Sequence, residues 1–217
     1  MDELLSEQEQ IEKVRGWIRS NALPLFGGVI LGLGIVFGWD KYDDYELNRS
    51  IDASNLYQEL SLYVSADDDA EAINIFEQLK EEYASSPYTD QAALLVTVMY
   101  LNNQNYSNAI ESLLYVLDNT SDEYLSIIAR VRLIRVYIEQ GLFNEAEALF
   151  IEEMPGEFLG RFDELRGDIY AALENNDAAR SAYTNALNSD SQLINRALIQ
   201  MKIDDLDISL NLEEGIR

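Results

Sequence analysis

The side chains of this sequence that could do chemistry are almost all carboxylates. Its 217 residues include 40 Asp and Glu against 15 Lys and Arg, with no His and no Cys, which gives a formal net charge of −25. The sequence therefore excludes histidine-based catalysis, thiolate nucleophiles, disulfide bonds and zinc sites built from histidine or cysteine. So acidic a chain is also unsuited to nucleic acids, because phosphate recognition requires a clustered basic surface.

The densest group of carboxylates, Asp67-Asp68-Asp69, could begin a calcium-binding loop. Counted from Asp67, the twelve-residue calcium pattern requires glycine at its sixth position and a bidentate acid at its twelfth. The sequence has Ala72 and Gln78 there, so we interpret the run as a solvated turn between two helices. Acid pairs for proton transfer could be drawn almost anywhere, and no phosphate-binding glycine motif is present. We predict no catalytic residue, no cofactor and no metal site.

One apolar segment differs sharply from the acidic remainder. Residues 22–39, ALPLFGGVILGLGIVFGW, contain no charge. As a helix they would extend about 27 Å, close to the roughly 30 Å of a hydrocarbon core. Pro24 falls in the first turn, and Trp17 and Trp39 flank the segment as aromatic residues do at membrane interfaces. The segment predicts a single transmembrane helix; a buried core helix and a cleavable signal peptide are the alternatives.

Basic residues set the expected orientation of that helix. Lys13, Arg15 and Arg19 precede the apolar segment, and only Lys41 and Arg49 lie in the 35 residues after it. The positive-inside rule then places the N-terminus in the cytoplasm and the C-terminal part on the other side, by a margin of three to two. The chain accordingly divides into a cytoplasmic segment 1–21, a membrane helix 22–39, a juxtamembrane linker 40–50 and a folded domain 51–217.

The apolar segment also contains two pairs of glycines four residues apart. Gly28 and Gly32 form one pair, and Gly34 and Gly38 form the other. Small residues at this spacing let a second membrane helix approach closely. We predict that these glycines contact a partner helix, although glycine is common in membrane helices for other reasons too.

A repeat of 33 to 37 residues organises the rest of the chain. Four alanines each follow a tyrosine by nine residues and precede a large apolar residue by four. An alanine lets two antiparallel helices approach, and the larger side chains fill the space beside it, which is the packing of tetratricopeptide repeats. The alanines are Ala72, Ala109, Ala146 and Ala179; the tyrosines are Tyr63, Tyr100, Tyr137 and Tyr170; the apolar residues are Phe76, Leu113, Phe150 and Tyr183.

The predicted fold class is all-α: a single N-terminal transmembrane helix, then an α-solenoid of about four tetratricopeptide-like helix pairs and a C-terminal capping helix. The first two repeats lack the glycine of the first helix, which Leu60 and Thr97 replace. We expect the capping helix over residues 191–204, and residues 203–212 could add an extended tail. An ordinary helical bundle is the alternative.

In this repeat class the first helix of each pair lines a concave groove. Tyrosine spacing places a partner-binding groove in the second and third repeats, formed by Leu94, Val98, Leu101, Ile128, Val131, Arg135 and Ile138. The same positions turn polar in the fourth repeat, at Arg161, Glu164 and Asp168. An apolar groove with a charged exit suits an extended or helical peptide. The alternative is a short array that closes this face on itself or on its capping helix.

Several parts of the sequence together resemble the YfgM-like proteins, the ancillary subunits of the bacterial Sec translocon. They are the lead EQEQIEKVRGWIRSN, the span GGVILGLGIVFGW, the segment ASNLYQEL and degenerate repeats ending in ALIQMKIDDLD. The resemblance implies a non-enzymatic, single-pass inner-membrane protein with a periplasmic repeat domain. Its implied partners are the SecYEG translocon, a membrane-anchored periplasmic chaperone of the PpiD type, and translocating polypeptides that it helps pass to periplasmic chaperones. The alternatives are a regulatory adaptor that binds a stress-response component, and an enzyme with a carboxylate site.

Overall fold

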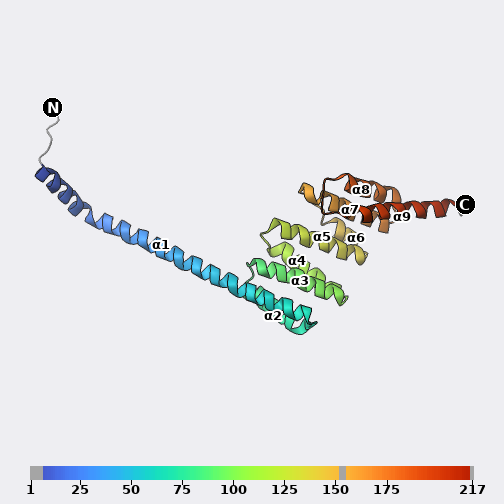
Figure 1. Ribbon diagram of the computed structural model, residues 1–217, viewed down its shortest axis with the longest axis horizontal. Coiled ribbons are helices and arrows are strands. Elements are labelled where there is room, and N and C mark those ends of the chain that lie inside the picture. Colours follow the sequence, from blue (N-terminus) through green and yellow to red (C-terminus); the bar gives the residue numbers. More distant parts are fainter. Residues whose placement is uncertain (1–6, 152–154, 216–217) are drawn as a thin grey trace, which may run out of the picture. The chain divides into compact units, whose positions relative to one another are not determined.

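The computed structural model describes residues 7–151 and 155–215, and every regular element among them is an α-helix (Figure 1). The predicted all-α class is therefore confirmed for these residues. The chain divides into two units, Met1–Asp52 and Ala53–Arg217, which we describe separately. The helices are α1 (Glu7–Ser65), α2 (Asp69–Glu82), α3 (Pro87–Asn102), α4 (Tyr106–Asn119), α5 (Glu123–Glu139), α6 (Phe143–Glu147), α7 (Gly156–Ala172), α8 (Asn176–Asn188) and α9 (Arg196–Gly215).

The described part of the first unit consists of α1 alone. The helix already includes the residues before the apolar segment, so Pro24 lies in its interior rather than in its first turn. Proline cannot donate the helical hydrogen bond and its ring crowds the preceding turn, which bends a helix. Residues 40–50, for which the sequence predicts a linker, are also helical and belong to α1.

No single helix among the described residues is long and apolar enough to cross a membrane. Glu9–Pro24 and Phe26–Ser65, bent by 49° at the break between them, meet that criterion together, by length and composition only.

Four helix pairs and a last helix form the second unit. Residues 53–65 of α1 pair with α2, α3 pairs with α4, α5 with α6, and α7 with α8, while α9 packs on α8 (Figure 1). The four alanines that mark the repeat all have 0% of their surface exposed. The alanine spacing therefore identified the positions at which the two helices of each pair meet.

The turn inside each helix pair is built in the same way. The fifth residue before each alanine has a left-handed backbone, with φ of 56° at Asp67, 55° at Gln104, 69° at Gly141 and 58° at Glu174. The next residue donates its N–H to the carbonyl of the repeat tyrosine, at 3.0 Å to Tyr63 and at 2.8 Å to Tyr100, Tyr137 and Tyr170. This is the Schellman arrangement, which satisfies carbonyls at the helix end. The tyrosine backbone thus closes the turn while its side chain packs beside the alanine.

The residue that donates this bond also begins the second helix. Asp68, Asn105 and Asn175 accept a hydrogen bond on their side-chain oxygen from the N–H three residues later, at 3.4, 3.3 and 3.3 Å. Leu142 occupies this position in the third repeat and has no side-chain acceptor. The second helix there, α6, has 5 residues, against 14 in α4. All four second helices begin three residues before the repeat alanine, so α6 is shorter at its C-terminal end, and its first turn lacks the side-chain acceptor that the other three have.

Restoring the cap should stabilise the third repeat. Leu142→Asn supplies the missing acceptor and should raise the free energy of unfolding by about 0.5–2 kcal/mol. The reciprocal change Asn175→Leu should lower it by a similar amount. Urea denaturation of the full chain in detergent, followed by circular dichroism, measures both. If Leu142→Asn lowers the free energy of unfolding, the missing cap is not what destabilises the third repeat.

The fourth repeat packs differently at the position twelve residues before its alanine. Leu60, Thr97 and Ile134 occupy this position in the first three repeats, and all three are fully buried. The fourth has Gly167, where an added Cβ would lie 2.3 Å from two atoms of the Tyr183 ring. The ring therefore lies directly on the α7 backbone, and this close approach requires glycine.

Gly167→Ala should accordingly destabilise the fourth repeat by about 1–3 kcal/mol, because the added methyl group overpacks the helix pair. This result runs against helix propensity, which favours alanine over glycine by about 1 kcal/mol. Gly156→Ala is the matched control, since nothing lies within 4 Å of an added Cβ there. Thermal melting should separate the two variants. Equal melting temperatures would contradict the packing of Tyr183 on Gly167.

The capping helix differs from the expected one at both ends. It begins at Arg196 rather than at residue 191, after Asn195 accepts a hydrogen bond from the Leu198 N–H at 3.1 Å. The extended tail that the sequence left as a possibility is not formed, because residues 203–212 belong to the same helix, which ends at Gly215. Ile199 and Ile203, with Leu206 three residues further, are buried against α8, so apolar spacing favours helix over an extended strand.

Candidate partner-binding surface

The seven predicted groove residues lie on α3 and α5, in unequal surroundings. Leu94 is 9% exposed and belongs to the core of the first two repeats. Val98, one turn further along α3, is 43% exposed. The remaining apolar members are half-buried: Leu101 and Ile128 pack at the edge of the first core, and Val131 and Ile138 at the edge of the next. Among the apolar residues predicted for the groove, Val98 is therefore the one most open to a partner.

A hydrogen bond holds the two helices side by side. Arg132 on α5 donates from Nη1 to the Leu94 carbonyl on α3, at 3.2 Å. Burial lowers the pKa of the Arg132 guanidinium, and the charge of Arg135 lowers it further. Arg132, which joins the two helices beneath this surface, is not among the residues predicted from the sequence. The signal was present, because α5 carries three arginines in a chain with few basic residues.

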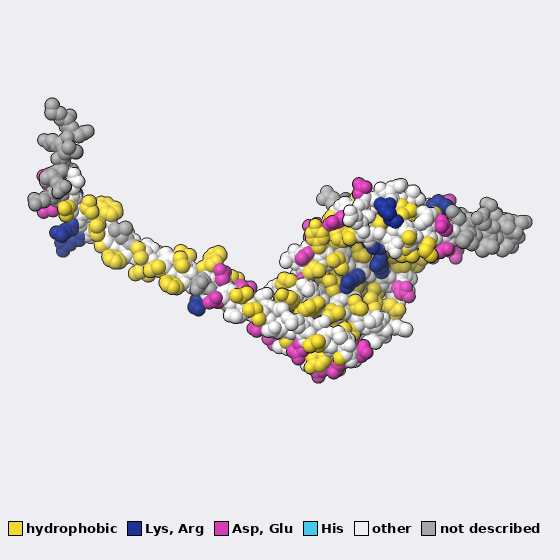
Figure 2. All heavy atoms as spheres, viewed as in Figure 1, with side chains coloured by type: hydrophobic (Ala, Val, Ile, Leu, Met, Phe, Trp, Pro, Cys, Tyr) yellow, Lys and Arg dark blue, Asp and Glu magenta, His cyan; other side chains and the backbone are white. Residues whose placement is uncertain are grey.

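Arg135 leaves a positive charge on this surface. Its side chain is exposed and makes no hydrogen bond or ion pair with any residue that the structure describes. We call Val98, Leu101, Ile128, Val131, Arg135 and Ile138 the α3–α5 surface. Figure 2 shows that apolar and basic side chains are interspersed over the middle of the repeat unit on the face in view, with acidic side chains mainly toward its margins.

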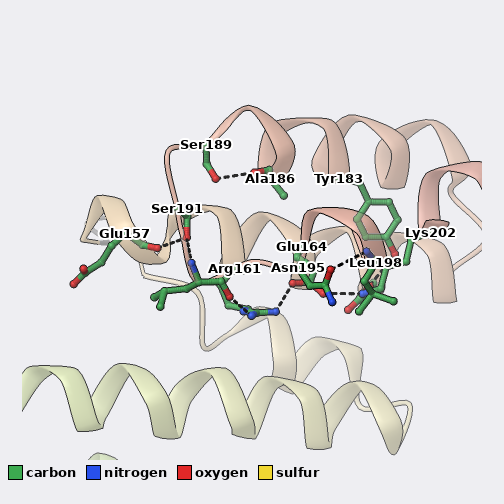
Figure 3. Close-up of polar contacts among 12 residues, drawn as sticks. Glu157, Arg161, Glu164, Tyr183, Ala186, Ser189, Ser191, Asn195, Leu198 and Lys202 are labelled. Carbon is green, nitrogen blue, oxygen red and sulfur yellow. Dashed lines mark hydrogen bonds and ion pairs between the residues drawn. The ribbon is translucent and has the colours of Figure 1, made fainter. Parts of the chain in front are cut away.

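The fourth repeat does not provide the expected charged exit. Glu164 is 2% exposed, and its two oxygens pair with Arg161 and, at 3.0 Å, with Lys202 of α9. Lys202 also lies 2.6 Å from Asp168, while Arg161 donates to the Leu193 carbonyl (Figure 3). The capping helix therefore covers this face, which is the closed alternative that the sequence left open.

These charges serve the fold rather than catalysis. Two carboxylates and two cations pair completely, which offsets the cost of removing them from water. Burial, followed by the charge of Asp168, raises the pKa of the Tyr183 hydroxyl, which donates to the Asp168 carboxylate at 2.8 Å.

The acidic run that could have started a calcium loop is the turn between α1 and α2. Asp67 supplies the left-handed residue, Asp68 caps α2, and Asp69 accepts a hydrogen bond from Asn103. Within residues 7–151 and 155–215, no group of three or more carboxylates could hold a metal ion. Each aspartate thus has a structural role.

The predicted membrane-contact glycines are open in the structure. At Gly28, Gly32, Gly34 and Gly38 an added Cβ would meet nothing within 4 Å. No part of the described chain packs on these four positions, so contact with a partner helix stays a prediction.

Asp90 is a buried acid outside this surface. It is 6% exposed on α3, and its Oδ1 has no hydrogen-bond partner among the described residues. Burial raises the pKa of Asp90, a hydrogen bond with Thr120 lowers it, and Asp122 raises it again. The burial outweighs the hydrogen bond, so the pKa of Asp90 lies above its ordinary value and the folded state disfavours the charged form.

The pH dependence of stability should reveal this cost. A carboxyl whose pKa is raised by folding contributes stability at acid pH that is lost as the pH rises through its folded-state pKa. Asp90→Asn should therefore increase the melting temperature at pH 7, and the gain should shrink toward pH 4. Asp118→Asn, at an exposed position on α4, is the control. A gain that does not change with pH would exclude ionisation of Asp90 as its cause.

Helix pairs with these turns and buried alanines define a tetratricopeptide-type solenoid. The chain belongs to the tetratricopeptide repeat-like family, whose model matches residues 15–208. It is 28% identical over 93% of its length to the ancillary SecYEG translocon subunit of Haemophilus influenzae, covering 98% of that protein. The proteins of the same name from Escherichia coli and Neisseria gonorrhoeae are 28% and 26% identical, over 94% and 93% of this chain and 98% of their own.

The resemblance expected from the sequence is therefore confirmed. Both the repeat family and the names of these relatives point to a non-catalytic scaffold associated with the Sec translocon.

Proposed function

We propose that this protein is a membrane-anchored repeat scaffold at the Sec translocon that helps pass translocating polypeptides to periplasmic chaperones. Relatives that align over almost the whole chain are named ancillary SecYEG translocon subunits. The observation that carries the proposal is the α3–α5 surface, where Val98 and the unpaired Arg135 are exposed although the fourth repeat is closed by α9.

In this proposal, residues 22–39 cross the inner membrane and residues 51–217 are periplasmic, joined by 40–50. Every large apolar side chain described between Leu23 and Trp39 is more than half exposed. Apolar surface costs about 25 cal/mol per Å² in water, a cost that lipid removes. The excess of basic residues in segment 1–21 supports a cytoplasmic location for that segment.

The membrane helix would then do more than anchor the domain. Gly28, Gly32, Gly34 and Gly38 leave open positions where a helix of SecYEG or of a PpiD-type chaperone could approach. The repeat unit would act on the periplasmic side of the same assembly.

The α3–α5 surface fits a short segment that carries apolar residues and a carboxylate. Val98 and the half-buried side chains around it offer apolar contact, and Arg135 offers a charge that pairs with an acid. Apolar contacts of this kind do not depend on one particular sequence in the bound chain, since the hydrophobic effect is non-directional. Such a surface suits a protein that handles many translocating polypeptides.

Site-specific crosslinking in intact cells tests this function. A photoreactive amino acid at Val98 should crosslink to a secretory polypeptide arrested in the translocon, or to a periplasmic chaperone. The matched position is Leu114 on α4, which is also exposed but belongs to a second helix, outside the α3–α5 surface. Val98→Asp combined with Arg135→Glu should reduce a crosslink from neighbouring Leu101 at least tenfold and leave the melting temperature unchanged, because both side chains are exposed.

Two results would contradict the proposal. Equal crosslinking from Val98 and Leu114 would mean that the α3–α5 surface is not selective. A folded double variant with undiminished crosslinks would move partner binding to the membrane helix or to another face.

A further inference from the structure

The part of α1 before the apolar segment has an apolar stripe of its own. Ile11, Val14, Trp17 and Ile18 are 50–61% exposed. At about 100° per residue, their side chains fall within an arc of about 120° on one side of the helix. Nothing in the described chain covers this stripe.

Basic residues border the stripe on both sides. On the same helical projection Arg15 follows one edge of the arc and Lys13 follows the other. Arg19 lies further round from the Arg15 edge, and Glu9 and Glu12 lie on the far side of the helix. Figure 2 shows basic side chains on one side of this end of the helix and apolar side chains on the other. Long basic side chains at the borders of an apolar face can place their charges at the level of lipid phosphates while their stems contact apolar surface.

The bend in α1 gives this segment a direction different from that of the helix after it. The axes of Glu9–Pro24 and Phe26–Ser65 differ by 49°. If residues 22–39 cross a membrane with an ordinary tilt of about 20°, the preceding segment can lie roughly 70° from the membrane normal. An amphipathic helix in that position faces the lipid surface with one side only.

We propose that residues 9–21 bind the surface of a membrane that contains anionic lipid, with Ile11, Val14, Trp17 and Ile18 inserted at the interface. The inference rests on the proposed membrane span. The charge of the segment indicates an anionic binding partner. Residues 13–21, next to the proposed span, include three basic residues and no acid, although the whole chain has a net charge of −25. Anionic headgroups supply the complementary charge, at about a fivefold gain in the equilibrium constant for each basic residue near the surface.

Tryptophan fluorescence of the full chain in lipid nanodiscs tests the proposal. The sequence has two tryptophans, so Trp39→Phe leaves Trp17 as the only one. In nanodiscs of phosphatidylcholine and phosphatidylglycerol, Trp17 emission should shift to shorter wavelength. It should also be quenched by lipids brominated near the headgroup rather than by acrylamide in the water. In phosphatidylcholine alone, or at high salt, acrylamide quenching should increase because charge attraction is lost or screened.

Two sets of variants test the contributions of the basic residues and of the apolar stripe separately. Lys13→Gln, Arg15→Gln and Arg19→Gln should each weaken attachment about fivefold, measured as the fraction of Trp17 protected against acrylamide. Ile11→Ser with Ile18→Ser should release the segment from both lipids. Gly16→Ser is the control, because it adds the same hydroxyl away from the stripe, where an added Cβ meets nothing within 4 Å.

A second variant, which keeps Trp39 and removes Trp17, distinguishes failure of this inference from failure of the proposed membrane span. In Trp17→Phe, Trp39 reports on the end of the apolar segment. If Trp39 is in lipid and Trp17 is equally water-exposed in both nanodiscs, the inference is wrong and the span stands. If Trp39 is also in water, the span fails and this inference fails with it. Protection of Trp17 only after SecYEG is added would likewise overturn lipid binding and identify a protein as the occupant.

Discussion

The repeat unit depends on the approach of two helices at a fully buried alanine, and that approach depends on the turn before it. Five residues before each alanine the chain takes a left-handed conformation, and one residue later an N–H closes the turn on the repeat tyrosine carbonyl. Only Gly141 suits this conformation without steric cost; Asp67, Gln104 and Glu174 adopt it as well. Packing at the alanine must therefore compensate for backbone strain in three of the four pairs.

The third helix pair departs from this pattern and shows that a side-chain contact can replace part of a helix. Leu142 gives the third pair no side-chain cap, and α6 ends already at Glu147. Arg130 of α5 donates to the Leu149 carbonyl, two residues beyond that end, at 3.2 Å, so a side chain holds the segment that a longer helix would have included. Because each repeat packs mainly on its neighbours, such a local replacement is tolerated without loss of the solenoid.

The helix pairs could be predicted from the spacing of residues within each repeat. The burial of individual side chains could not, because it depends on contacts between repeats. Alanine and tyrosine periodicity located all four turns, because both residues act within a single repeat. The burial of Glu164 could not be foreseen, since it depends on Lys202, 38 residues away on a helix expected to begin earlier. Leu94 and Val98 have the same helical spacing and chemistry, yet one belongs to the core and the other is exposed. Arg132 of α5 bonds to the Leu94 carbonyl, and a repeat pattern does not specify such a tertiary contact.

The small number of basic residues in so acidic a chain makes the surroundings of each one informative. Arg161 and Lys202 neutralise Glu164 and Asp168 beneath the capping helix, while Arg130 and Arg132 hold backbone carbonyls of neighbouring elements. These cations stabilise the stack and cannot also bind a partner without leaving buried acceptors unpaired. Arg135 lies on the same helix as Arg130 and Arg132 but is exposed, beside apolar side chains that the solenoid leaves half-buried. The few positive charges are thus divided between the interior, where they pair with acids and carbonyls, and the surface, where Arg135 is exposed.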